Sequence, residues 1–256
     1  MKLYKRAAAL ILTAATLLSL APPVSAEGDR VTISSAKEFY ALVQNCTRDV
    51  WSQGVTVELT ADLDLSGSDF QPIPIFQGTF HGNGHTIRGI TYDHKGSTLG
   101  LFRTLTESAV VEGLCVEGLL EPQGSASQLG LLAGENYGAI RSCSAKGTVS
   151  GQEDVGGLVG VNGETGRIEG SSSQVQISGV TNVGGIAGQN LGTLDRCINT
   201  GALNSDPDQE IPTSVGGVAG LSRGTIQSCS NSGEIGYQHL GYNVGGIVGL
   251  QSGSVL

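Results

Sequence analysis

The chain has 256 residues, 40 of them glycine, with 39% hydrophobic and 5% aromatic side chains. Its formal charge of −9 disfavours nonspecific binding to nucleic acid or to an anionic membrane. The hydrophobic content excludes a disordered chain, and the glycine content predicts many turns around a thin aliphatic core.

Residues 1–26 have the layout of a secretory signal peptide. Lys2, Lys5 and Arg6 precede an apolar run over residues 7–20, and small residues follow up to Ala26. This order predicts cleavage after Ala26, because the run is short for an uncleaved membrane anchor. The mature chain would keep eleven basic and 23 acidic residues, a formal charge of −12. No later segment has the length of a transmembrane helix, so we expect no membrane insertion of the mature chain.

Residues 27–98 are expected to form an N-terminal cap and the first coils of a larger array. Within them, residues 31–54 predict a short helix. Ser34 or Ser35 can cap its start, and Phe39, Leu42 and Val43 recur at helical spacing. An amphipathic helix here would cover the unpaired edge of the first coil.

Residues 99–256 are organised by a repeat. "VGGLVG" at 155–160 returns as "VGGIAG" at 183–188, "VGGVAG" at 215–220 and "VGGIVG" at 244–249, with degenerate copies at 99–104 and 129–134. The aligned glycines lie 26 to 32 residues apart, which indicates a solenoid rather than a phosphate loop. Alternating runs between the copies predict about three short strands per repeat. We therefore expect a parallel β-helix, since a β-propeller needs longer strands and aromatic signatures.

Two columns of equivalent residues support stacked coils. The first is polar, and we expect it to form hydrogen bonds along the stack, with asparagine tolerating left-handed turn geometry. The second accepts cysteine, serine or leucine, which is typical of a small inward packing position. A bridge between Cys197 and Cys229 is left open, while Cys115 has the opposite parity and Cys46 lies in the cap. The first column is Asn136, Asn162, Asn190, Ser222 and Gln251; the second is Leu114, Cys143, Ser171, Cys197 and Cys229.

The repeats resemble the GLUG motif of bacterial surface proteins and of the region ahead of the catalytic domain in IgA1-specific metallopeptidases. The segments "VELTADLDLSGSDFQPI" (57–73), "FQGTFHGNGHTIRGI" (76–90) and "LGLFRTL" (99–105) resemble that family's entry pattern. His81 departs from it, because the family has aspartate there. The resemblance implies a right-handed parallel β-helix that is secreted or displayed on the cell surface. It does not bring protease activity, since the chain has no His-Glu-x-x-His motif.

The sequence gives little support for a metal or nucleotide site. His81 and His85 flank a Gly-Asn-Gly turn, and we expect His85 to bond backbone there rather than a metal ion. The glycine units also lack the aspartate that calcium-binding nonapeptide repeats require. No cofactor is predicted, although calcium stays possible at an acidic loop.

Coil length varies just before each glycine unit, which predicts that the insertions share one edge of the solenoid, often a binding edge. A cation or glycan contact is conceivable there, against the alternative of a solvated acidic loop. The variable segments are 122–128, 151–154, 179–182, 204–214 and 236–243, and the candidate ligand-binding residues are Asp206, Asp208, Glu210, Tyr237, His239 and Tyr242.

Two functions follow from these observations. The first is a non-enzymatic surface or secreted module, an adhesin-like binding scaffold or spacer, with an extracellular glycan or protein as its partner. The alternative is a secreted carbohydrate-active β-helix enzyme, which needs carboxylates clustered in a groove. Glu112, Glu169 and Asp195 look scattered along the strands, so we prefer the first. The last repeat stops at Leu256, which predicts further C-terminal domains or a partner covering that end.

Overall fold

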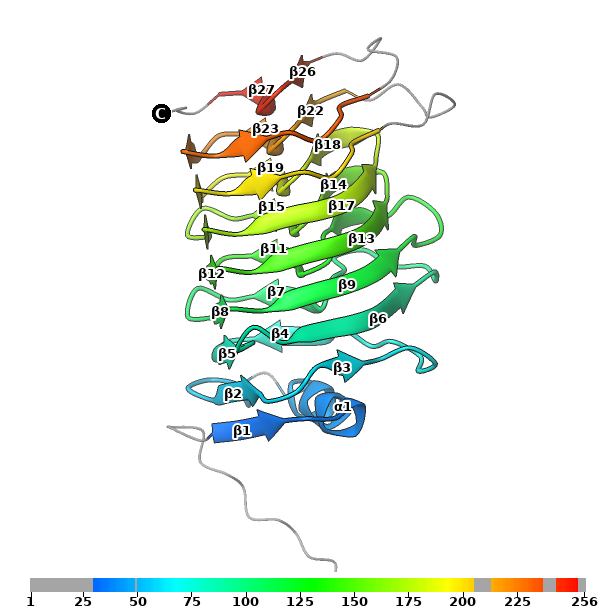
Figure 1. The fold of residues 1–256 in the computed structure, drawn as a ribbon, viewed down its shortest axis with the longest axis vertical. Helices are drawn as coiled ribbons and strands as arrows, with labels where there is room; N and C mark the ends of the chain where they lie inside the picture. Colours follow the sequence, from blue (N-terminus) through cyan, green and yellow to red (C-terminus); the bar gives the residue numbers. More distant parts are fainter. Residues whose placement is uncertain (1–29, 49, 205–212, 237–242, 253–256) are drawn as a thin grey trace, which may run out of the picture.

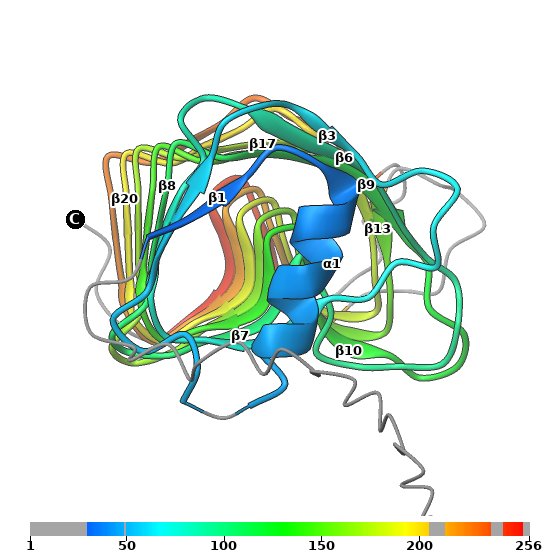
Figure 2. The same ribbon diagram turned by 90° about the horizontal axis from the view of Figure 1, so that it is seen from below.

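The computed structural model describes residues 30–48, 50–204, 213–236 and 243–252, which form a parallel β-helix (Figure 1). Seen from its amino-terminal end, the chain runs clockwise from β8 through β9 to β10 as the coils recede (Figure 2), so the helix is right-handed. The expected fold is confirmed. Among the described residues, no helix is long and apolar enough to cross a membrane.

A full coil contains four strands rather than the three expected. The additional strand belongs to the sheet numbered 3 below. This sheet begins only at β10, because earlier coils carry loops or an isolated bridge at Leu99 in its place. We number the sheets in chain order within a coil. Sheet 1 contains β1 (Arg30–Ile33), β2 (Thr56–Leu59), β5 (Thr79–His81), β8 (Val110–Glu112), β12 (Ala139–Arg141), β16 (Arg167–Glu169), β20 (Thr193–Asp195) and β24 (Thr225–Gln227). Sheet 2 contains β3 (Leu63–Asp64), β6 (Thr86–Tyr92), β9 (Cys115–Leu120), β13 (Ser144–Ser150), β17 (Ser172–Ser178), β21 (Ile198–Asn199) and β25 (Ser230–Asn231).

The other two sheets flank each glycine unit, and within these two sheets the pairings between coils are parallel and in register. Sheet 3 contains β10 (Ser127–Leu129), β14 (Glu153–Gly156), β18 (Thr181–Gly184), β22 (Val215–Gly216) and β26 (Val244–Gly245). Sheet 4 contains β4 (Ile73–Phe76), β7 (Phe102–Leu105), β11 (Ala133–Asn136), β15 (Val159–Asn162), β19 (Ala187–Asn190), β23 (Ala219–Ser222) and β27 (Val248–Gln251).

Each glycine unit turns the chain inward between sheets 3 and 4 (Figure 2). A Cβ atom on Gly157 would lie 2.2 Å from the Ser173 hydroxyl oxygen of sheet 2, and one on Gly185 would lie 2.4 Å from Cγ of Asn199. The residue after the second glycine points into the core, and its backbone N–H bonds the next coil, as in Leu158 N–H to Ile186 O at 3.0 Å. Glycine is therefore required at Gly157 and Gly185, because the backbone of the turn comes close to sheet 2 across the core.

The predicted asparagine column forms a buried ladder. Asn136 donates to Asn162 at 2.8 Å, Asn162 donates to Asn190 at 2.8 Å, and Asn190 donates to the Ser222 hydroxyl at 3.2 Å. These residues end the strands of sheet 4 and bond through their side chains, without the left-handed backbone we expected. Since a buried amide without a partner is costly, the ladder favours one register between coils.

The amino-terminal cap contains the predicted helix, α1 (Ala36–Asn45). Ser35 caps its start by accepting from the Glu38 N–H, and Phe39, Leu42 and Val43 are buried as expected. The helix crosses the open end of the core (Figure 2). We expected it to cover the unpaired edge of the first coil, but in sheet 1 the strand β1 pairs with β2 at that edge. The cap thus covers the core and leaves β1 as the edge strand of that sheet.

Adding one methyl group to a glycine turn tests its approach to sheet 2. We expect Gly185→Ala to lower the free energy of unfolding by about 1–3 kcal/mol, because its Cβ would also lie 2.1 Å from the Gly217 carbonyl oxygen. Gly246 holds the same turn position, but no atom of the described residues lies within 4 Å of where its Cβ would be, so Gly246→Ala should change stability by less than about 0.5 kcal/mol. Urea unfolding of both variants measures this, and equal losses would contradict the account.

Candidate functional site

All six predicted ligand-binding residues lie outside the described residues: Asp206, Asp208 and Glu210 fall within 205–212, and Tyr237, His239 and Tyr242 within 237–242. The prediction that the variable segments share one edge of the solenoid can be checked from the strands that flank them. The connections at 151–152 and 179–180 run from sheet 2 to sheet 3, and Leu203 and Val215 occupy the matching positions on either side of the longest insertion. The described residues that flank the variable segments therefore lie at one edge of the solenoid, between sheets 2 and 3.

Charged side chains form one column along the outer face of sheet 1. The register aligns Glu58 with His81, His81 with Glu112, and Arg141 with Glu169, one residue per coil. Glu112, Glu169 and Asp195, which look scattered in the sequence, belong to this column, so that expectation was wrong. They look scattered because the coils between them differ in length.

Side chains of this column contact one another or basic residues beside the column. His81 Nδ1 lies 2.7 Å from a Glu112 carboxylate oxygen, and Arg30 lies 2.8 Å from Glu58. Arg196 contacts Glu169 and also Asp195. A hydrogen bond from the Asn83 side-chain amide is the main cause that lowers the pKa of Glu58. Glu58, Glu169 and Asp195 are therefore paired with arginines beside the column, and His81, where the resembled family has aspartate, contacts Glu112.

A groove of about 320 Å³ lies on the outer face of sheet 2, between β3, β6 and β9. It follows from a β-bulge: Ile87 pairs with Val116 and Ile90 with Gly118, so two residues of β6 oppose Glu117 alone. Gly89 has a φ of 76°, and a Cβ there would lie 2.3 Å from the Ser66 nitrogen. The bulge therefore depends on glycine, and Gly89 and Gly118 both line the groove.

Polar groups converge on this groove from three strands. The Asp64 carboxylate accepts from the Ser66 N–H at 3.0 Å, from the Ser66 hydroxyl at 2.5 Å and from Arg88 Nε at 3.0 Å. These bonds, with the Ser66 hydroxyl contributing most, lower the pKa of Asp64 to about 2. Glu117 and the half-exposed Leu119 complete the lining. The site thus offers fixed acceptors, the remaining N–H groups of a guanidinium, and an apolar wall.

The second histidine of the Gly-Asn-Gly turn contacts a carboxylate. His85 Nδ1 lies 3.2 Å from Asp62, whereas we expected its side chain to bond backbone. The Thr86 N–H also donates to Asp62 at 3.0 Å and is the main cause that lowers the pKa of that carboxyl. In the part of the chain that the structure describes, no group of three or more His, Cys, Asp or Glu side chains is placed to hold a metal ion.

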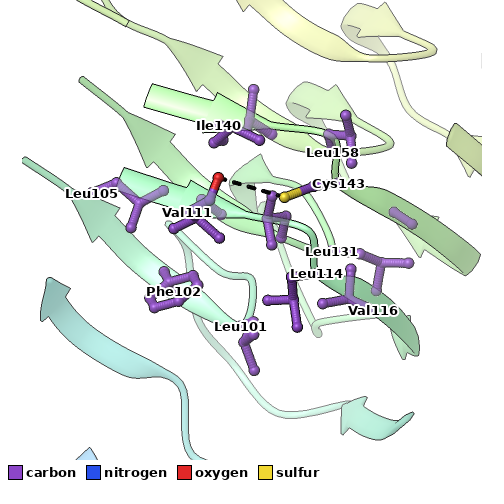
Figure 3. Packing of buried hydrophobic residues seen from close by; sticks show 14 of the residues in the cluster. Leu101, Phe102, Leu105, Val111, Leu114, Val116, Leu131, Ile140, Cys143 and Leu158 are labelled. Carbon is purple, nitrogen blue, oxygen red and sulfur yellow. Dashed lines mark hydrogen bonds between the residues drawn. The ribbon is translucent and has the colours of Figure 1, made fainter. Parts of the chain in front are cut away.

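The cysteine column points inward, as predicted. Cys143 is 2% exposed and packs beside Leu114 and Leu131, with its thiol toward the Val111 carbonyl oxygen at 3.6 Å (Figure 3). Burial raises the pKa of the Cys143 thiol to about 12, so it behaves as a compact apolar side chain. Ser171 takes the same place in the next coil and accepts from the Cys143 N–H at 3.1 Å. All five cysteines are free thiols in this structure.

Comparisons with known proteins agree with this fold. Residues 125–150 and 151–178 each match the GLUG motif. Halomucin of Haloquadratum walsbyi is 36% identical over 119 residues, 40% of this chain and 1% of its own length. A protein of Evansella cellulosilytica described as a Gly-rich membrane protein is 33% identical over 96 residues, 35% of this chain and 11% of its own. The chain therefore spans a small part of either relative.

A solved structure shares the fold at low sequence identity. A protein from Bacteroides ovatus described as an immunoglobulin A1 protease superposes with a TM-score of 0.59 and 21% identity, over 80% of this chain and 66% of that one. Residues 125–178 thus contain two GLUG motifs within a β-helix, as the sequence indicates, and the fold is similar to that of the Bacteroides protein.

The pKa of Asp64 provides a test of the groove. Because folding lowers it from 3.8 to about 2, Asp64 stabilises the folded state above pH 4, and this contribution is lost as pH falls from about 4 towards 2. We expect a carboxyl carbon titration by NMR to give a value near 2, and Ser66→Ala to raise it. Ser68→Ala, which removes no bond to Asp64, is the control; a wild-type value near 3.8 would contradict the described network.

Proposed function

We propose that this chain is a non-enzymatic, secreted or cell-surface β-helix module that acts as an adhesin-like scaffold and binds an extracellular saccharide. The observation that carries the proposal is the groove at the β6 bulge, where Asp64 and Arg88 are held in place by their own hydrogen bonds. The halomucin similarity and the expected signal peptide support a place outside the cell.

The charges of the groove favour a neutral sugar. Asp64 and Glu117 are two carboxylates against the one guanidinium of Arg88, so an acidic sugar would meet a net negative site. Vicinal hydroxyls can donate to the carboxylates and accept from the guanidinium, while Leu119 offers an apolar contact. The volume of 320 Å³ lies at the small end of ligand pockets and suits one or two sugar rings.

The carbohydrate-active enzyme remains the second candidate, because the carboxylates of sheet 1 do form a column. Glycoside hydrolysis needs one carboxyl whose pKa is raised so that it can donate a proton. In this column Glu58 has a lowered pKa, Glu169 is ion-paired with Arg196, and Glu112 contacts His81. Burial raises the pKa of Asp154, but this residue lies in β14 beside Asn182 and outside the column. The pattern therefore favours binding over hydrolysis.

An array of neutral and acidic glycans and matrix proteins, probed with and without calcium, tests the proposal. We expect neutral glycans to bind, and Arg88→Ala to weaken binding at least about tenfold, because one charge-assisted bond is lost. Arg141→Ala, which removes an exposed cation from sheet 1, is the matched control and should bind normally. A blank array would leave a spacer as the function, and equal binding by both variants would exclude the groove as the binding site.

The variable edge is tested in the same assay by loop exchange. Residues 205–214 can be replaced by Gly-Val-Thr-Asn, the sequence at 179–182 that makes the same connection one coil earlier. Loss of binding to any array component would place a ligand contact on this edge. Incubation with polysaccharides covers the alternative, since release of reducing ends or unsaturated products would establish an enzyme.

A further inference from the structure

Cys197 and Cys229 occupy the same position in successive coils. Each follows the sheet 1 strand by two residues, and the register of those strands aligns Asp195 with Gln227. The Cys197 N–H donates to the Cys229 sulfur at 3.3 Å, so this sulfur lies directly over the neighbouring cysteine. Each thiol also bonds the carbonyl oxygen two residues before it, at 3.5 and 3.3 Å. The two side chains are therefore fixed in one orientation, side by side.

The other cysteines lack such a neighbour in the column. Cys143 stands between Leu114 and Ser171, and its N–H meets a hydroxyl rather than a sulfur. Cys115 pairs with Ser144 on the outer side of sheet 2, and Cys46 ends α1 at the amino-terminal end. Within the described ranges, the thiol pair is thus specific to the coils that begin at β20 and β24.

We propose that Cys197 and Cys229 form a dithiol site that a low-molecular-weight disulfide oxidises to a covalent link between two coils. Paired strands lie about 4.8 Å apart, and disulfides join residues whose Cα atoms are about 4.4–6.8 Å apart, so the backbone can keep its place. The proposal concerns the stability of the solenoid and does not depend on the saccharide groove.

The two thiols differ in reactivity, which gives the reaction an order. Cys229 is partly exposed, and a hydrogen bond from the side chain of Cys197 is the main cause that lowers its thiol pKa. Cys197 is fully buried, and that same bond, followed by burial, raises its thiol pKa. Cys229 is therefore the thiolate that an external disulfide meets first.

The electrons balance in two exchange steps. The Cys229 thiolate attacks one sulfur of the external disulfide, forms a mixed disulfide and releases one thiolate. Cys197 then gives its proton to the released thiolate or to solvent and attacks the Cys229 sulfur, which expels the second external thiolate. Two protein thiols are oxidised, and one external disulfide is reduced to two thiols. The second step is the slower one, because Cys197 must lose a proton in a buried position.

The link would close a loop over residues 197–229, which contains the longest insertion of the variable edge. A cross-link removes conformational freedom from the unfolded chain, and in a solenoid it couples two neighbouring coils. We expect the oxidised protein to melt roughly 5 °C above the reduced protein.

Oxidised glutathione is the probe, applied to the folded full chain, followed by unfolding and alkylation with N-ethylmaleimide. Trypsin cuts after Arg196 and Arg223, so the two cysteines lie on separate peptides, residues 197–223 and 224–256. We expect these peptides to be linked and three of the five cysteines to be alkylated. Five alkylated cysteines, or a link through another cysteine, would overturn the proposal.

Single variants test the order of attack. Cys197→Ser should stop at one glutathione adduct on Cys229, and Cys229→Ser should leave Cys197 unmodified because it is buried. Cys143→Ser is the matched control from the same column and should keep the link. Serine is tolerated in this column at Ser171, so all three variants are expected to fold. An adduct on Cys197 in the Cys229→Ser variant would overturn the order.

Discussion

The approach of each glycine turn to sheet 2 is the contact on which the cross-section of the solenoid depends. Gly157 lies against Ser173, Gly185 against Asn199, and the next turn repeats the arrangement. The degenerate copy at 129–134 keeps the same turn but carries side chains of different volume. Leu131 holds the turn position one coil before Gly157, and the sheet 2 column there carries Ala145 in place of Ser173. At Leu131 a larger side chain on the turn is thus matched by a smaller one across the core, whereas Leu101, one coil earlier, shares its coil with Val116.

Polar ladders inside the coils then fix how neighbouring coils align. Asn162 is fully buried and has amide partners in the coils before and after it, and Asn199 donates in the same way to Asn231 of sheet 2 at 2.8 Å. A shift of one residue would leave these groups without partners in a water-free interior. Because turns and inward columns serve stacking, the outward positions and the connections from sheet 2 to sheet 3 are free to vary. Both candidate binding regions lie there.

Much of the fold can be predicted from the sequence because its signals are either local or repeated in a fixed order. The helix after Ser35 depends on a pattern within a few residues. The inward cysteine column and the Asn136 ladder follow from aligning repeats that recur every 26 to 32 residues. Sheet 3 is missed because its strands are two to four residues long and merge with the glycine units. The corners after sheet 1 are missed as well, since Ser142 and Arg196 take left-handed backbone angles that usually favour glycine.

The outer surface is less predictable, because it depends on register between coils of unequal length. The sequence does not show that Glu112, Glu169 and Asp195 share a column, nor that a bulge at Gly89 brings Arg88 to Asp64. Ser66, two residues after Asp64, was a local signal for a hydrogen-bonded carboxylate and could have been found.

The most direct test of the central contact is a double-mutant cycle between Gly157 and Ser173, measured by urea unfolding. A Cβ on Gly157 would lie 2.2 Å from the Ser173 hydroxyl oxygen, so removing that oxygen should make the added methyl group less costly. We predict that Gly157→Ala destabilises the Ser173→Ala protein less than the wild type, with a coupling of at least about 0.5 kcal/mol. Additive effects of the two substitutions would show that the turn does not press against sheet 2, and would contradict the account.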